Sequence, residues 1–175
     1  TILSLMTPDS WFALSARDFF QRNEQGHIDL PRLKEGGVTC QVMALYIEPQ
    51  YKPAASARRC LEMLDAFCNL LDQSEEFVMA TKTQHILDAK ADGKVAGLLS
   101  IEGGEAIEGS LSVLRNFYRL GVRAIGLTWN QRNDLADGVG EKSAKSGLTD
   151  LGVSVVKEME KLGMLVDVSH LSESS

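Results

Sequence analysis

The sequence has no apolar stretch of the roughly 20 residues that a helix needs to cross a bilayer. Its first residues also lack the basic, apolar and small-residue order of a signal peptide. Positive charge is in the minority, with 18 Lys and Arg against 24 Asp and Glu and a formal net charge of −6. Nucleic-acid binding needs clustered positive charge on one face. These absences predict a cytoplasmic protein that binds neither membranes nor nucleic acids.

Cysteine is scarce, and Cys40, Cys60 and Cys68 form neither a CxxC pair nor an even disulfide framework. Reduced thiols in the core of a cytoplasmic protein fit this pattern best. A nucleotide signature is missing too. The glycines of EGGEAIEGS, residues 102–110, lack the GxGxxG spacing and the downstream acidic residue of a dinucleotide fold. The sequence therefore gives no support to a nucleotide site.

What the sequence does contain is an alternation of strand-like and helix-like segments. Continuous apolar runs predict strands that are covered on both faces, and apolar residues spaced by three and four predict helices with one buried face. The predicted strands are 37–47, 77–81, 95–101, 122–129 and 164–170. The predicted helices are 8–23, 56–71, 83–91, 107–120 and the segment between Thr149 and Gly163, with a polar loop over 130–147.

Strand and helix alternate about four times without a linker or a change of composition. This order predicts parallel strands joined by right-handed crossovers within one domain, residues 1–175. The fold class is α/β, and a (β/α)8 TIM-type barrel of the metal-dependent hydrolase kind fits it best. Such a barrel typically needs about 250 residues, and Ser172 is typical of the first cap of another helix. We therefore expect only part of a barrel in this chain, as an internal portion of a longer protein.

Glu102 follows the apolar strand VAGLLSI and precedes two glycines. A carboxylate at the end of a buried strand is costly unless a cation accompanies it, and a metal ion is the simplest cation. Barrels of this class build their active sites at the carboxyl ends of their strands. The alternative is a carboxylate that only accepts hydrogen bonds from the start of the next helix, and the sequence leaves this open.

His170 closes the last predicted strand, in which Asp167 also lies. Its imidazole is a candidate metal ligand, with a neighbouring group such as Asp167 fixing its tautomer. A purely structural histidine is the alternative. Trp129 and Asn130 stand at the end of another strand, where an indole N–H and an amide can contact a polar substrate. For Trp129 the alternative is a side chain that only fills the rim of the barrel.

Three parts of the sequence together resemble the membrane dipeptidase (renal dipeptidase) family of zinc peptidases, and in particular a bacterial-type member. They occur in the order and with the spacing of that family. They are DLPRLKEGGV, then IEGGEAI followed by SLSVLRNFYRLGVRAIGLTWN, and finally GLTDLGVSVVKEMEKLGMLVDVSHLSE. The resemblance covers almost the whole chain.

The resemblance implies a metal-dependent (β/α)8 barrel in which Glu102 bridges two zinc ions and His170 binds the second of them. Paired zinc ions would lower the pKa of a bridging water, and the resulting hydroxide would attack the peptide carbonyl. The implied substrates are dipeptides, with a D-residue tolerated at the C-terminal position. Family members often dimerise, so a homodimer is among the expected assemblies.

The resemblance also implies groups that this sequence lacks. A His-x-Asp motif with two further ligands is expected directly before Thr1. A last zinc histidine, a substrate-binding arginine and a proton-transferring aspartate are expected after Ser175. Trp129 stands where many members carry a substrate-contacting histidine. Two alternatives stay open: a binuclear metal amidase or lactonase acting on N-acyl amino acids, and a metal-free, non-catalytic relative.

Overall fold

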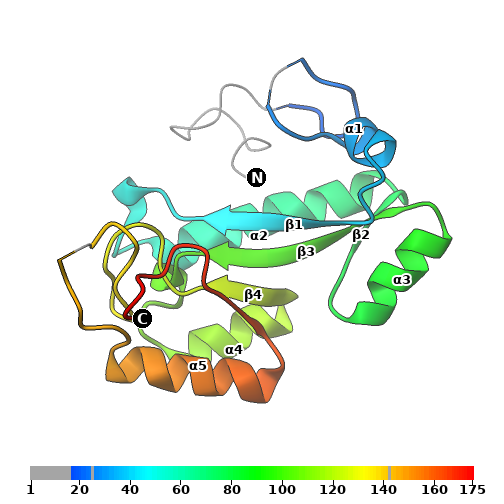
Figure 1. Ribbon diagram of the computed structural model, residues 1–175. Coiled ribbons are helices and arrows are strands. Elements are labelled where there is room, and N and C mark those ends of the chain that lie inside the picture. Colours follow the sequence, from blue (N-terminus) through cyan, green and yellow to red (C-terminus); the bar gives the residue numbers. More distant parts are fainter. Residues whose placement is uncertain (1–16, 25, 142) are drawn as a thin grey trace. The chain divides into compact units, whose positions relative to one another are not determined.

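The computed structural model describes residues 17–24, 26–141 and 143–175 (Figure 1). Its contacts divide the chain into two compact units. The first contains the described residues up to Leu45 together with Leu61–Leu99, and the second contains Tyr46–Cys60 and Ser100–Ser175. The elements in chain order are α1 (Leu30–Glu35), β1 (Cys40–Tyr46), η2 (Pro49–Tyr51), α2 (Ser56–Gln73), β2 (Phe77–Met79), α3 (Thr83–Ala91), β3 (Val95–Glu102), η3 (Gly104–Ile107), α4 (Leu111–Arg119), β4 (Val122–Gly126), α5 (Asp150–Leu162) and β5 (Leu165–Asp167).

Parallel strands and an aromatic cluster form the core of the first unit. Strands β2 and β3 pair in parallel, with Phe77 opposite Val95. The rings of Phe19 and Phe67 pack edge to face on Phe77, with centroid distances of 4.9 and 5.8 Å. A Cβ at Gly97 would lie 2.6 Å from the ring of Phe77. Glycine at this position therefore makes room for the cluster.

The helix predicted over 8–23 is wrong for its described part, residues 17–23, which form turns and bends. The side-chain amide of Asn23 donates hydrogen bonds to the carbonyls of Asp18 and Gln21. Such bonds offer the backbone an alternative to helical pairing. The rest of this predicted helix lies outside the described residues.

Helix α1 was not predicted, although its sequence carries the usual start signals. Asp29 caps it by accepting the backbone N–H of Arg32 at 2.9 Å, and Pro31 stands in its first turn. The guanidinium of Arg32 also donates to Asp29 at 2.6 Å. Burial alone would raise the pKa of Asp29, but the hydrogen bonds and the charge of Arg32 outweigh it and hold the pKa below its usual value.

In the second unit, β4 pairs in parallel with β5, with Ile125 opposite Val166. Helices α4 and α5 lie side by side, with α4 packed on β4 and α5 on β5 (Figure 1). Arg115 of α4 and Glu158 of α5 link the two helices at 2.9 Å. The turn that follows β3 is joined to the end of β4, because the N–H of Gly103 donates to the carbonyl of Gly126 at 3.1 Å.

The strand order is β1-β3-β4-β5, with β2 also paired with β3. The β2–β3 and β4–β5 pairs are parallel, which confirms the predicted α/β fold with a parallel sheet. Within the described residues the sheet stays open, as expected for part of a barrel. None of the helices in these residues is long and apolar enough to cross a membrane.

The predicted helix over 107–120 begins later than expected. Glu108 and Gly109 have φ values of 48° and 68°, in the left-handed region that interrupts a helix. A short 3-10 turn therefore comes first, and α4 starts at Leu111. The side chain of Glu108 accepts the N–H of Ala57 at 3.0 Å and so caps the first turn of α2.

Candidate active site

All four predicted site residues lie in the second unit, at or just beyond the ends of parallel strands. Glu102 is the last residue of β3, and Trp129 and Asn130 follow the end of β4 closely. His170 comes three residues after the end of β5, so the prediction that it closes this strand is wrong. Carboxyl ends of parallel strands share one edge of a sheet, and this edge gathers the four side chains.

Glu102 and His170 converge on one point. His170 Nε2 lies 3.5 Å from Glu102 Oε1, and the two side chains are 32% and 31% exposed. This distance is longer than a normal N–H···O hydrogen bond, so each group keeps the capacity to bind another partner. The contact with His170 gives Glu102 a partner that the alternative of a simple helix-start acceptor does not include.

The imidazole of His170 is oriented by Asn130 rather than by Asp167. His170 Nδ1 lies 3.0 Å from Asn130 Oδ1. Asp167 instead accepts from Ser169, through both its backbone N–H and its hydroxyl. The predicted role of Asp167 in fixing the tautomer is therefore wrong. An amide oxygen at Nδ1 favours a proton on that nitrogen and leaves the lone pair of Nε2 on the side of Glu102.

The backbone of His170 is held by two donors from the β4 side of the site. Thr128 Oγ1 donates to the His170 carbonyl at 3.1 Å, and the N–H of Val139 donates to the same carbonyl at 2.8 Å. The loop over 130–147 therefore folds back onto the segment that carries His170. Gly138 allows this approach, because a Cβ there would lie 2.4 Å from the carbonyl oxygen of Trp129.

Trp129 forms part of an aromatic wall beside the carboxylate and the imidazole. Its ring lies 6.1 Å from that of His170 and 5.1 Å from that of Tyr46, which it meets edge to face. Burial, followed by the charges of Glu102, Glu105 and Glu48, raises the pKa of Tyr46. The phenol is therefore protonated at neutral pH and can donate a hydrogen bond at this edge.

Sequence reasoning missed several charged and aromatic residues next to this site. Tyr46 ends an apolar strand as Glu102 does, and this signal could have identified it. Lys52 Nζ lies 2.9 Å from Glu105 Oε1 and 5.5 Å from the centroid of the Tyr46 ring. Two buried side chains, Glu48 and Arg59, form a two-bond ion pair at 2.7 and 3.0 Å.

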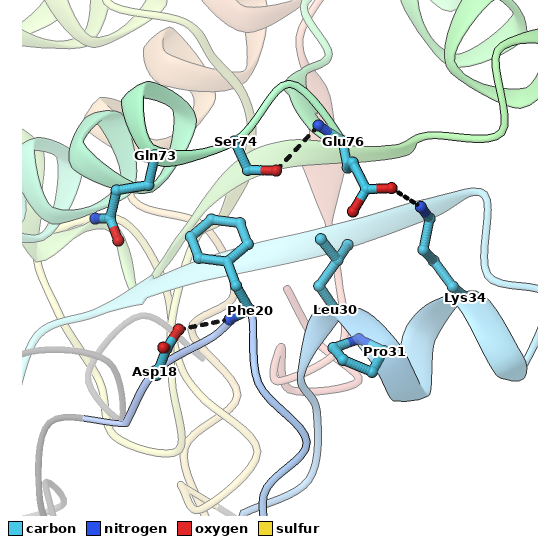
Figure 2. A pocket seen from close by; sticks show the side chains of 8 residues that line it. All are labelled: Asp18, Phe20, Leu30, Pro31, Lys34, Gln73, Ser74 and Glu76. Carbon is cyan, nitrogen blue, oxygen red and sulfur yellow. Dashed lines mark hydrogen bonds and ion pairs between the residues drawn. The ribbon is translucent and has the colours of Figure 1, made fainter.

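Each of the two units has a pocket. The second unit has a pocket of about 610 Å³, lined by Pro49, Lys52, Pro53, Gly104, Glu105, Glu108, Gly109, Gln131, Arg132, Asn133, Asp134 and Leu135. The first unit has a pocket of about 540 Å³, shown in Figure 2 and lined by Asp18, Phe20, Leu30, Pro31, Lys34, Gln73, Ser74 and Glu76. None of the four predicted site residues lines either pocket. The pocket of the second unit is instead lined by residues that follow Glu102 and Asn130 in the sequence, such as Gly104 and Gln131.

The donor set fits a divalent metal ion. A carboxylate and an imidazole, each about one third exposed and neither satisfied by the other, are ligands that zinc accepts. In the part of the chain that the structure describes, no group of three or more His, Cys, Asp or Glu side chains gathers to hold a metal. Within the described residues the candidate ligands are therefore two, Glu102 and His170.

Comparisons with known proteins agree with this chemistry. A family model described as membrane dipeptidase (Peptidase family M19) matches residues 5–175. Dipeptidase 3 of Mus musculus is 33% identical over 175 residues, which cover 92% of this chain and 35% of that protein. The chain therefore spans about a third of the length of this relative.

Solved structures give the same result. The crystal structure of a dipeptidase of family M19, dipeptidase AC, superposes with a TM-score of 0.80 at 28% identity, covering 87% of this chain and 49% of that one. A metallopeptidase from Rhodobacter sphaeroides, liganded with a phosphinate mimic of the dipeptide L-Ala-D-Ala, gives 0.77 at 28% identity, covering 87% and 52%.

Proposed function

Because the chain belongs to the membrane dipeptidase family, Peptidase family M19, we propose that its protein hydrolyses the peptide bond of dipeptides with the help of bound metal. Membership of a metallopeptidase family implies dependence on a metal ion. The observation that carries the proposal is the convergence of Glu102 and His170, 3.5 Å apart at the carboxyl edge of a parallel sheet.

We propose two zinc ions as the metal, with Glu102 and His170 among their ligands. When bound, such a pair would supply activation of a water molecule for attack on the peptide carbonyl and stabilisation of the charge on the carbonyl oxygen. The two oxygens of Glu102 suit a carboxylate that serves both ions. Asn130 holds the His170 imidazole so that Nε2 is the ligating atom.

The aromatic wall supports a small polar substrate. Trp129 offers an indole N–H beside the imidazole, and the ring of Tyr46 packs against it. Asn130 is engaged with His170, so its proposed part in substrate binding acts through the position of that ring. We include dipeptides with a C-terminal D-residue, and the relative solved with a mimic of L-Ala-D-Ala supports this choice.

The test uses the full-length natural protein. We expect about two zinc ions per chain by elemental analysis, and chelator-sensitive cleavage of L,L and L,D dipeptides. A panel of N-acyl amino acids and lactones serves as the comparison. Bound metal with cleavage of that panel alone would replace the proposal by an amidase or lactonase, and the absence of metal would favour a non-catalytic relative.

Two variants assign the ligands. Glu102→Gln should lose metal and activity together, because the remaining amide is a poor bridge between cations. His170→Ala should keep about one metal and little turnover. His85→Ala is the matched control, because His85 lies on α3 and contacts Thr81 instead of the site. Full activity in His170→Ala would contradict the assignment.

A further inference from the structure

A partly buried ion pair joins two segments that flank the site. Lys52 belongs to the loop that follows β1, and Glu105 belongs to η3, three residues after Glu102. Lys52 Nζ and Glu105 Oε1 are 2.9 Å apart, and the side chains are only 18% and 14% exposed. Pairs so little exposed are screened much less by salt than surface pairs. The pair therefore fixes the distance between the loop and the turn.

The carboxylate of Glu105 packs against the residue that follows the candidate ligand. A Cβ placed on Gly103 would lie 2.4 Å from Glu105 Oε2. Gly103 itself has a φ of 99°, where only glycine is unstrained. On its other side, its N–H donates to the carbonyl of Gly126. The backbone directly after Glu102 is thus held between β4 and the Glu105 carboxylate.

The ammonium of Lys52 also contacts Tyr46, which belongs to the aromatic wall. It lies 5.5 Å from the centroid of the Tyr46 ring, a distance typical of a cation–π contact. Tyr46 in turn packs on Trp129, and Trp129 on His170. One cation therefore contacts both the aromatic wall and the turn after Glu102.

The carboxylate depends on this cation. Glu105 Oε2 is buried and accepts no hydrogen bond from the described residues, so Lys52 is the partner that offsets its charge. A buried carboxylate that loses its cation is strongly destabilised, and it can recover its hydration only by turning out to water. That movement would release Gly103 and, with it, the orientation of Glu102.

We propose that Lys52 and Glu105 are positioning residues, which orient Glu102 for metal binding and hold the aromatic wall beside it. This inference rests on the proposed function, because Glu102 is a metal ligand only there. Neither residue touches the metal or the substrate in this role. Their effect passes through Gly103 on one side and through Tyr46 on the other.

The experiment measures zinc affinity by competition with a chromophoric chelator, together with KM and kcat for a dipeptide and stability in urea. Lys52→Met and Glu105→Gln in the full-length protein should each weaken zinc binding about 10-fold or more, as loss of an outer partner of a metal ligand typically does. Lys52→Arg keeps the cation and should stay within about threefold of wild type.

Arg115→Met is the matched control, because it breaks another 2.9 Å ion pair of the same unit, between α4 and α5. It should lower stability and leave zinc affinity unchanged. If a single variant fails to fold, Lys52→Met combined with Glu105→Gln removes both charges and should show the same loss of affinity.

The outcomes separate the inference from the function on which it rests. Suppose that the wild-type protein binds zinc and cleaves dipeptides, and that Lys52→Met and Glu105→Gln bind zinc as tightly as it does. This result would overturn the positioning role alone. An equal loss of affinity in Arg115→Met would overturn it as well, by showing a general loss of stability. Wild-type protein without zinc or dipeptide cleavage would overturn the proposed function first.

Discussion

Replacing Asn130 by Ala should weaken zinc binding through His170 without unfolding the protein. The change removes the oxygen that lies 3.0 Å from His170 Nδ1 and leaves the imidazole free to rotate. Partners of this kind typically contribute 10- to 100-fold in metal affinity, which corresponds to about 1.4 to 2.7 kcal/mol. We expect the lower end, about 10-fold, because Thr128 and Val139 still hold the His170 carbonyl.

The assay is chelator competition on the full-length protein, with urea unfolding in parallel. Asn133→Ala is the matched control, because this side chain donates to the Leu127 carbonyl at 2.7 Å and accepts from Leu135 at 2.9 Å without contacting His170. It should cost more stability and less zinc affinity. Asn130→Asp keeps an acceptor at Nδ1 and should bind zinc at least as tightly as wild type. Zinc affinity in Asn130→Ala within twofold of wild type would refute the reasoning.

Three further predictions concern stability and reactivity. Arg59→Met leaves the fully buried carboxylate of Glu48 without its cation and should cost about 3 to 5 kcal/mol in urea unfolding, whereas a neutral pair at both positions should restore most of it. Burial raises the pKa of Cys60 to about 12, so thiol labelling followed by mass spectrometry at neutral pH should modify the other two cysteines first. The lowered pKa of Asp29 adds stability that is present above its unfolded value and is lost as pH falls through the folded value, so Asp29→Asn should flatten the decline of stability below about pH 4; an unchanged acid profile would contradict this.

The local sequence pattern was sufficient to predict most of the helices and strands. The helix between Thr149 and Gly163 was predicted with both ends, because the Thr149 side chain caps Gly152 and Gly163 adopts a left-handed φ of 69°. The ends of helices were less well predicted where the backbone enters the left-handed region, as at Glu108. Side-chain hydrogen bonds from Asn23 likewise replaced a predicted helix with turns.

The site likewise has parts that the local sequence indicates and parts that depend on contacts between distant residues. The placement of Glu102 and Trp129 at or just beyond strand ends could be predicted because each closes an apolar run. The contact between Asn130 and His170 spans 40 residues, and that between Lys52 and Glu105 spans 53. Nothing in the local sequence indicates such partners, since they depend on how loops pack after the sheet has formed.

The close packing of the loop over 130–147 on His170 restricts how this part of the protein can diverge in evolution. Any side chain larger than hydrogen at position 138 would collide with the Trp129 carbonyl and displace the segment that also holds His170. Insertions can be accommodated more easily near Ser143 and Lys145, whose side chains are exposed. We therefore expect related chains to vary in length at the outer end of the loop, while position 138 keeps its glycine.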